Sequence, residues 1–120
     1  MRLQAQIARI EPDVTIVRLI GKLITRVEGH TLEELVQELV RRGEKKLIFD
    51  LCGIEEIGSS ACRFLMQCYF TTREAGGDLR LATANPKVIR LCRISRLDAM
   101  LPFYRTVAAA AERFGLAKGA

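Results

Sequence analysis

The chain begins with alternating polar and apolar positions, which predict a β-strand. Between residues 2 and 10, every second residue from Leu3 to Ile7 is apolar, as in a strand with one buried face. The proline and aspartate at 11–13 favour a tight turn, because proline presets a backbone dihedral and aspartate bonds nearby backbone. The β-branched run at 14–21 predicts a second strand. Together the two segments predict an antiparallel hairpin.

An apolar stripe at helical spacing predicts the first helix. Its five members would share one helix face; they are Leu32, Leu35, Val36, Leu39 and Val40. Thr31, with Glu34 three residues later, matches a capping box, in which each side chain bonds the backbone amide of the other residue. Gly43 suits the position just past a helix end. The helix is therefore expected to begin after Thr31 and to end before Gly43.

The rest of the chain alternates between strand and helix patterns. The expected elements are strands at 45–53, 78–84 and 101–106 and helices at 59–77, 85–94 and 107–114. Asn85 and Pro86 mark a helix start, because asparagine caps well and proline fits the first helical position. The double glycine Gly76–Gly77 is expected to end the preceding helix. Residues 115–120 are expected to form a flexible tail, and residues 1–114 a single domain.

This order of elements predicts an α/β fold. A hairpin followed by strands that alternate with helices indicates a mixed, mostly parallel sheet of four to five strands with about four flanking helices. A length of 120 residues suits one domain with one core. No stretch approaches the roughly 18–20 apolar residues of a membrane span, and the N-terminal segment does not match a secretory signal. We therefore expect no membrane association and a cytoplasmic location.

Charge and cysteine content exclude several classes of function. The net charge is +5, but acidic residues interleave with the basic ones, and no tryptophan is present to stack on bases. The basic residues are locally dense only at 41–46 and in the series Lys87, Arg90, Arg93 and Arg96. Direct DNA binding is not expected, and a solvated basic surface or a preference for acidic partners remain open. Four scattered cysteines and one histidine match no common metal motif, so we expect no metal or cofactor and buried, reduced thiols.

Two adjacent serines, Ser59 and Ser60, lie between a predicted strand and a predicted helix and are the chief candidates for chemistry. A nucleophilic serine would need a base, but the G-x-S-x-G pattern is absent, and His30 is the only histidine. Glu55 and Glu56 are neighbours, so in an extended chain their side chains point to opposite sides. The sequence therefore predicts no enzyme.

The remaining interpretations of the pair are a helix cap and a phosphate acceptor. A serine at a helix start commonly caps it, contributing about 1 kcal/mol. Gly58 would allow the strand to turn abruptly into the helix. A phosphate on Ser59 would meet unpaired backbone amides and the positive end of the helix dipole. On local physics both interpretations stay open.

Over residues 2–114 the chain resembles the STAS domain family, the anti-sigma factor antagonists of bacteria. The resemblance rests on a strand ending in aspartate, a turn with two serines, a double glycine and a helix started by proline. The positions that match are Asp50, Ser59, Ser60, Gly76, Gly77, Pro86, Leu97 and Pro102. Gly21 and Leu23 are in register with a further family motif near the end of the second strand. The segment 24–30 looks like a short insertion.

The resemblance implies a non-catalytic module that binds an anti-sigma factor of the serine kinase type and is released by phosphorylation of Ser59. Ser60 would support that residue. This chain departs from the family pattern by having Gly58 where an aspartate precedes the acceptor, and Ala61 where a glycine follows the pair. Ile24 replaces a second acidic residue. Losing two carboxylates should weaken contact with a basic partner.

Two further interpretations follow from these departures. The chain could be a divergent STAS scaffold that acts without phosphorylation, by self-association or by binding other STAS proteins. It could also bind a small anion such as a nucleotide at the helix start, with Arg63 nearby. Beside Ser59, the residues expected to support the site or to contact the partner are Gly21, Leu23, Gly58, Ser60 and Arg63.

Overall fold

The computed structural model describes residues 3–119, and of residues 113 and 115–119 the backbone alone. Its strands are β1 (Gln4–Ile10), β2 (Val14–Leu23), β3 (Lys46–Ile57), β4 (Asp78–Ala82) and β5 (Phe103–Tyr104). Its helices are α1 (Arg26–Arg41), α2 (Ala61–Glu74), α3 (Pro86–Ile94) and α4 (Val107–Gly119), with a 3-10 turn at Leu97–Ala99. The helix α4 thus continues into the segment that was expected to be a tail.

The five strands form one sheet in the order β1-β2-β3-β4-β5. The hairpin strands β1 and β2 are antiparallel, whereas β2, β3, β4 and β5 are parallel to one another. Each parallel connection crosses over through a helix, as parallel pairing requires. The α/β prediction of a mixed, mostly parallel sheet with four helices is confirmed.

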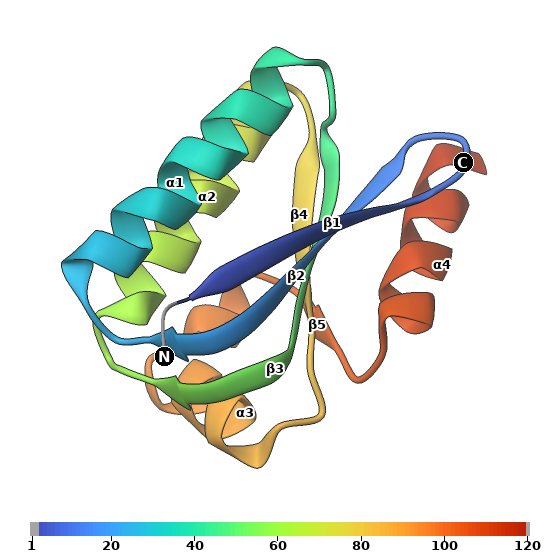
Figure 1. Cartoon of the computed structure of the whole chain (residues 1–120). Coiled ribbons are helices and arrows are strands. Elements are labelled where there is room, and N and C mark those ends of the chain that lie inside the picture. Colours follow the sequence, from blue (N-terminus) through green and yellow to red (C-terminus); the bar gives the residue numbers. More distant parts are fainter. Residues whose placement is uncertain (1–2, 120) are drawn as a thin grey trace.

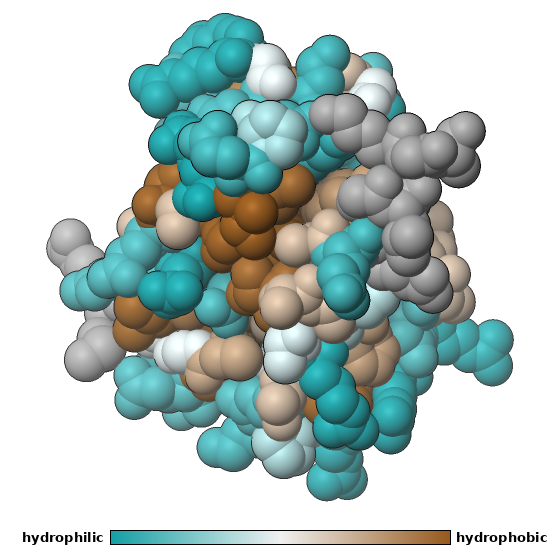
Figure 2. Space-filling model, turned by 90° about the vertical axis from the view of Figure 1, so that its right-hand side faces the viewer, coloured by the Kyte–Doolittle hydropathy of each residue, from teal (hydrophilic) through white to brown (hydrophobic). Residues whose placement is uncertain are grey.

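Helices cover both faces of the sheet (Figure 1). On one face, the apolar residues of α1, α2 and α3 pack with those of β2, β3 and β4 in the main core. On the other face, Ala110 and Phe114 of α4 pack against Val14, Ile16 and Ile48. Figure 2 views the α4 side and shows apolar residues gathered at the centre of that surface, ringed by hydrophilic ones. The sheet is therefore the middle layer of three.

The first helix starts six residues earlier than its sequence pattern predicted. The N-cap is Thr25, whose hydroxyl accepts a hydrogen bond from the Glu28 amide, while the Glu28 carboxylate accepts from the Thr25 amide at 2.8 Å. The Thr31–Glu34 box is therefore wrong, and the Thr31 hydroxyl instead donates to the Val27 carbonyl. The presumed insertion at 24–30 contains the cap and the first helical turn. The predicted apolar stripe is confirmed, because Leu32, Val36 and Leu39 are buried and Leu35 and Val40 pack against them.

The hairpin prediction is correct. The predicted buried face of its first strand is wrong for Ala5 and Ile7, whereas Leu3, just before β1, is partly buried against the main core. All seven residues of β1 are exposed, including Ile7 and Ile10. The strand lies at the edge of the sheet, and neither core cluster contains a β1 residue. Alternation in sequence therefore did not correspond to a covered face, because the helices pack over the central strands.

Other element boundaries follow local signals. The Asn85 side chain accepts from the Lys87 amide and Pro86 opens α3, as predicted. The helix α2 ends at Glu74, and Gly76 follows with a φ of +89°, a conformation that favours glycine. The strand predicted at 45–53 runs on to Ile57.

The cysteines divide by position. Cys68 and Cys92 are buried, as expected, but Cys62 is half-buried and Cys52 is exposed, so the expectation of burial is wrong for these two. Burial raises the pKa of the Cys68 thiol to about 12 and that of Cys92 to about 11. Desolvation raises the pKa of Cys52 as well.

Candidate functional site

Ser59 and Ser60 lie where β3 gives way to α2, and both are exposed. Ser60 occupies the N-cap position, but its side chain makes no cap hydrogen bond. Its hydroxyl instead donates to the Ile24 carbonyl at 2.9 Å, which ties the start of α2 to the connection between β2 and α1. The interpretation of this pair as a side-chain helix cap is therefore wrong. Ser59 makes no side-chain hydrogen bond to the residues that the structure describes, and its hydroxyl is accessible.

The backbone conformation at this turn does not require glycine at position 58. Its amide donates to the Leu23 carbonyl at 3.0 Å, and it is absent from the positive-φ glycines, which are Gly21, Gly43 and Gly76. A Cβ at Gly58 would lie 3.5 Å from the nearest atom, Cγ2 of Ile24, an ordinary contact. The position could therefore hold the aspartate of the family pattern. Glycine here removes a negative charge and is not needed to avoid a steric clash.

Two arginines flank Ser59. The hollow at the serines has a volume of about 610 Å³ and is lined by Arg26, Ser59, Ser60, Cys62, Arg63 and Phe64. An adjoining hollow shares Arg26, Arg63 and Phe64 and adds His30, Glu33 and Gln67. The sequence pointed to Arg63 but missed Arg26, because Arg26 belonged to the segment interpreted as an insertion. We call Arg26, Ser59 and Arg63 the Ser59 face.

The Ser59 face is electropositive. Neither Arg26 nor Arg63 forms an ion pair within residues 3–119. The nearby Glu33 carboxylate lies 3.2 Å from His30 Nδ1. Guanidinium groups bind phosphate and carboxylate well, because their planar donors match both oxyanions. The face can therefore receive an anion, either a phosphate on Ser59 or an acidic side chain of a partner.

A close helix contact lies beneath this face. Gly29 of α1 is buried against Phe64 of α2, and the Phe64 ring meets the His30 ring edge-on with 5.9 Å between centroids. Within the described chain, no hydrogen bond joins His30 to either serine. The contact between Gly29 and Phe64 therefore sets the spacing between Arg26 and Arg63. His30 packs on Phe64 and does not serve as a base for either serine.

The end of α3 adjoins the Ser59 face. Cys62 Sγ lies 3.2 Å from Ser95 Oγ, which places the last turn of α3 beside the first turn of α2. Ile94 is 71% exposed and Val27 is 74% exposed, and Arg93 is exposed as well. Large exposed apolar residues of this kind occur in protein-binding surfaces.

The structure places the other predicted site residues in the protein interior. Leu23 is fully buried in the main core, so it supports the fold and presents no surface to a partner. Gly21 is buried as well, and its φ of +113° accompanies an irregularity in the pairing of β2 with β3. Asp50, at the family's aspartate position, accepts from the Cys52 amide at 3.1 Å and from Arg18 Nε at 3.2 Å. These residues therefore contribute to the packing, pairing and hydrogen bonding of strands β2 and β3.

Other chemistry is not supported by the described residues. No group of three or more histidine, cysteine, aspartate or glutamate side chains is placed to hold a metal ion within that part of the chain. Glu55 and Glu56 are both exposed at the end of β3. Between residues 3 and 119, none of the helices is both long enough and apolar enough to span a membrane.

Comparison with solved structures identifies the same fold in bacterial regulators. An anti-sigma factor antagonist from Mycobacterium paratuberculosis is 22% identical over 92% of each chain, with a TM-score of 0.81. The anti-sigma factor antagonist SpoIIAA in its unphosphorylated form is 16% identical over 92% of this chain and 96% of that one, with a TM-score of 0.75. The phosphorylated form of Bacillus SpoIIAA is 15% identical over 92% and 99%, with a TM-score of 0.68. No curated protein matches the chain.

The comparison of sequence with family models agrees with the comparison of folds. The model described as the STAS domain matches residues 5–110, which include every strand from β2 to β5, helices α1 to α3 and the Ser59 face. Because this match covers most of the chain, the protein belongs to the STAS domain family.

Proposed function

We propose that this protein is a non-catalytic, cytoplasmic regulator of the anti-sigma factor antagonist type, which binds a serine-kinase anti-sigma factor through the Ser59 face and is released when Ser59 is phosphorylated. The observation that carries the proposal is the exposed Ser59 beside Arg26 and Arg63. Membership of the STAS family and the fold shared with anti-sigma factor antagonists support the regulatory role.

The charge of the Ser59 face defines the kind of partner surface. Arg26 and Arg63 form no ion pair with the described residues, and they favour a partner that presents acidic side chains, because opposite potentials steer association and fix register. A phosphate adds about two negative charges at a place where two guanidinium groups can hold it. Phosphorylation would then neutralise the cationic face and repel the acidic surface. In the family pattern an aspartate stands at the position of Gly58. Its loss here agrees with a surface that attracts an acidic partner rather than a basic one.

Phosphorylation provides the direct test. The purified chain is incubated with ATP and a kinase-type anti-sigma factor from the same genome, and phosphate incorporation is followed by intact mass. We expect one phosphate on the wild-type protein and none on Ser59→Ala. Ser60→Ala is the matched control, since it removes the neighbouring hydroxyl and its bond to Ile24 but leaves Ser59 in place.

Binding of the same partner tests the switch. Calorimetry should show that the unmodified chain binds and that the phosphorylated chain binds at least about tenfold more weakly, a difference of about 1.4 kcal/mol. Arg63→Ala should weaken binding of the unmodified chain. Ser59→Ala phosphorylated as fully as wild type, or equal affinity before and after phosphorylation, would refute the phosphoswitch.

A second candidate function is a STAS scaffold that works by self-association. The observation that favours it is β1, an edge strand whose seven residues are all exposed and which carries partly exposed Ile7 and Ile10. An unpaired strand edge offers backbone donors and acceptors to a second strand. Light scattering distinguishes this function: a concentration-dependent dimer lost in Ile7→Lys supports it, and a monomer at every concentration contradicts it.

A further inference from the structure

A second cavity lies at the opposite end of the sheet from Ser59. It has a volume of about 480 Å³, within the range of about 300–1,000 Å³ typical of small-molecule sites. Three connections line it, at Asp13 between β1 and β2, at Gly43 and Lys45 between α1 and β3, and at Gly76–Gly77 between α2 and β4. The length of β3 separates this cavity from the Ser59 face, because the cavity adjoins the first residue of that strand and Ser59 follows its last.

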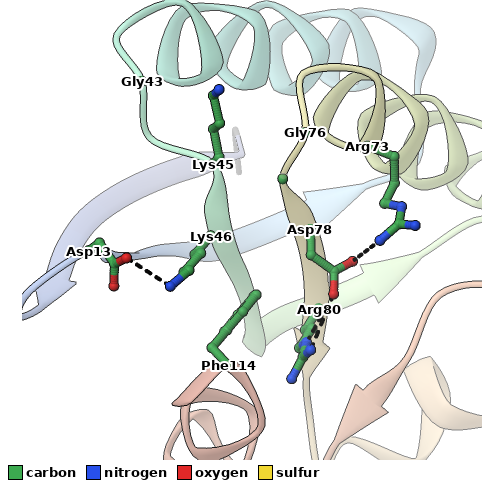
Figure 3. A pocket seen from close by; sticks show the side chains of 10 residues that line it. Asp13, Gly43, Lys45, Lys46, Arg73, Gly76, Asp78, Arg80 and Phe114 are labelled. Atoms are coloured by element: carbon green, nitrogen blue, oxygen red, sulfur yellow. Dashed lines mark hydrogen bonds and ion pairs between the residues drawn. The ribbon is translucent and has the colours of Figure 1, made fainter. Parts of the chain in front are cut away.

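The lining of this cavity has an excess of two positive charges. The cations are Lys45, Lys46, Arg73 and Arg80, and the carboxylates are Asp13 and Asp78. Figure 3 shows Lys46 turned toward Asp13 on one side and Asp78 beside Arg73 and Arg80 on the β4 side. Lys46 Nζ lies 2.8 Å from Asp13. Lys45 forms no ion pair with the described residues, so it supplies unneutralised charge.

The floor of the cavity is rigid. Arg80 is 8% exposed, and its guanidinium carbon lies 4.1 Å from the centroid of the Phe114 ring. The same guanidinium donates to Asp78 Oδ2 at 3.2 Å. These contacts hold Arg80 in one place, and so its charge is preorganised rather than assembled when a ligand arrives.

Arg73 and Lys45 are the adaptable cations on the walls. The Arg73 side chain is 57% exposed, and its guanidinium approaches Asp78 only to 3.9 Å, a long and solvated ion pair. Lys45 is exposed and sits where the chain passes closely over Gly77, since a Cβ on Gly77 would lie 2.2 Å from the Lys45 carbonyl oxygen. Both side chains can turn toward an anion at little cost.

We propose that this cavity binds a small dianion, of the phosphate monoester class, between Lys45, Arg73 and Arg80. A dianion balances the two excess positive charges, and charge-assisted hydrogen bonds from lysine and arginine to phosphate are among the stronger polar contacts in proteins. Backbone amides do not take part, because the amides of Gly43, Gly76 and Gly77 already donate to helix carbonyls. The site goes beyond the Ser59 switch and is independent of it.

The glycines allow the site to be tested by NMR titration. Glycerol 3-phosphate is added to the full chain at low salt while the amide signals are followed, with glycerol as the uncharged control. We expect saturable shifts at Gly43, Gly76 and Gly77 with glycerol 3-phosphate and none with glycerol. Gly29 and Gly58, at the other end of the sheet, should not move.

A pair of matched double variants tests the charges. Lys45→Gln/Arg73→Gln should weaken binding about tenfold, because two charge-assisted contacts are lost. Lys87→Gln/Arg90→Gln removes the same charge from α3, outside the cavity, and should leave the affinity unchanged. Arg80 is kept in both variants because it also holds Phe114.

The outcomes separate this site from the Ser59 face. The absence of shifts up to about 10 mM ligand, shifts confined to Gly29 and Gly58, or equal affinity in the two double variants would overturn the proposal. Loss of phosphorylation in Ser59→Ala has no bearing on it, and loss of ligand binding in Lys45→Gln/Arg73→Gln has no bearing on the switch.

Discussion

Replacing Gly29 by alanine should reveal how α1 and α2 are held together beneath the Ser59 face. A Cβ at Gly29 would lie 2.2–2.4 Å from three ring atoms of Phe64, far inside any normal contact. The ring has little room to move, because Phe64 is only 8% exposed. The substitution must therefore push α1 and α2 apart or force the ring off its preferred rotamer.

Two opposing effects set the size of the change. Overpacking in a dense core costs about 1–3 kcal/mol, and three contacts this short indicate the upper half of that range. Alanine recovers about 1 kcal/mol of helix propensity relative to glycine. The net expectation for Gly29→Ala is a loss of about 1–2 kcal/mol in the free energy of unfolding.

Urea unfolding of a double-mutant cycle with Phe64→Ala measures the contact. Phe64→Ala alone should cost about 3–5 kcal/mol, and in that background Gly29→Ala should become stabilising by up to about 1 kcal/mol, because the clash is gone. A Gly29→Ala protein at least as stable as wild type, or an equal loss in both backgrounds, would refute the proposed packing. The same variant should also weaken partner binding, since it changes the separation of Arg26 and Arg63.

Three smaller predictions concern the segment around the Ser59 face. Thr25→Ala should lower the free energy of unfolding by about 1 kcal/mol through loss of the N-cap, whereas Thr31→Ala should change it by less than half as much; urea melts of the two variants decide which threonine caps α1. Hydrogen bonds from the Thr25 and Ile24 amides lower the pKa of Glu28 below its usual value, so its carboxylate stabilises the fold above pH 4.5 and this contribution is lost as the pH falls through the lowered pKa. The stability difference between wild type and Glu28→Gln should therefore shrink in acid, and a pH-independent difference would contradict the assignment. Gly58→Asp should leave the melting temperature within a few degrees of wild type, because a side chain fits there; a severe loss of stability would show that the turn needs glycine.

Local chemistry in the sequence determined most of the elements. The start of α3 could be predicted because Asn85 and Pro86 act within one helical turn. The end of α2 could be predicted because the left-handed conformation at position 76 favours glycine. The buried stripe of α1 was readable from its spacing alone. From this periodicity the α/β class and the mixed sheet followed, and the strand and helix patterns on either side placed Ser59 at a strand-to-helix turn.

Tertiary packing decided where α1 begins. Two threonine–glutamate boxes compete at its N-terminus, Thr25–Glu28 and Thr31–Glu34, and both satisfy the local rule. The earlier box caps the helix in the structure, and the extra turns place Gly29 against Phe64. A contact between residues this far apart in the chain has no local signature.

Burial and the charged sites also depend on long-range contacts that have no local signature in the sequence. The sequence determined that β1 alternates, but only the assembled sheet decided that β1 lies at an uncovered edge. It supplied Arg26 and Arg63 on separate helices, and only their packing brought both to Ser59. It supplied Lys45 just before β3 and Arg80 on β4, and only three converging connections enclosed them in a cavity. Secondary structure follows from interactions within a few residues, whereas sites arise where distant segments meet, and that meeting is decided by the packing of the whole domain.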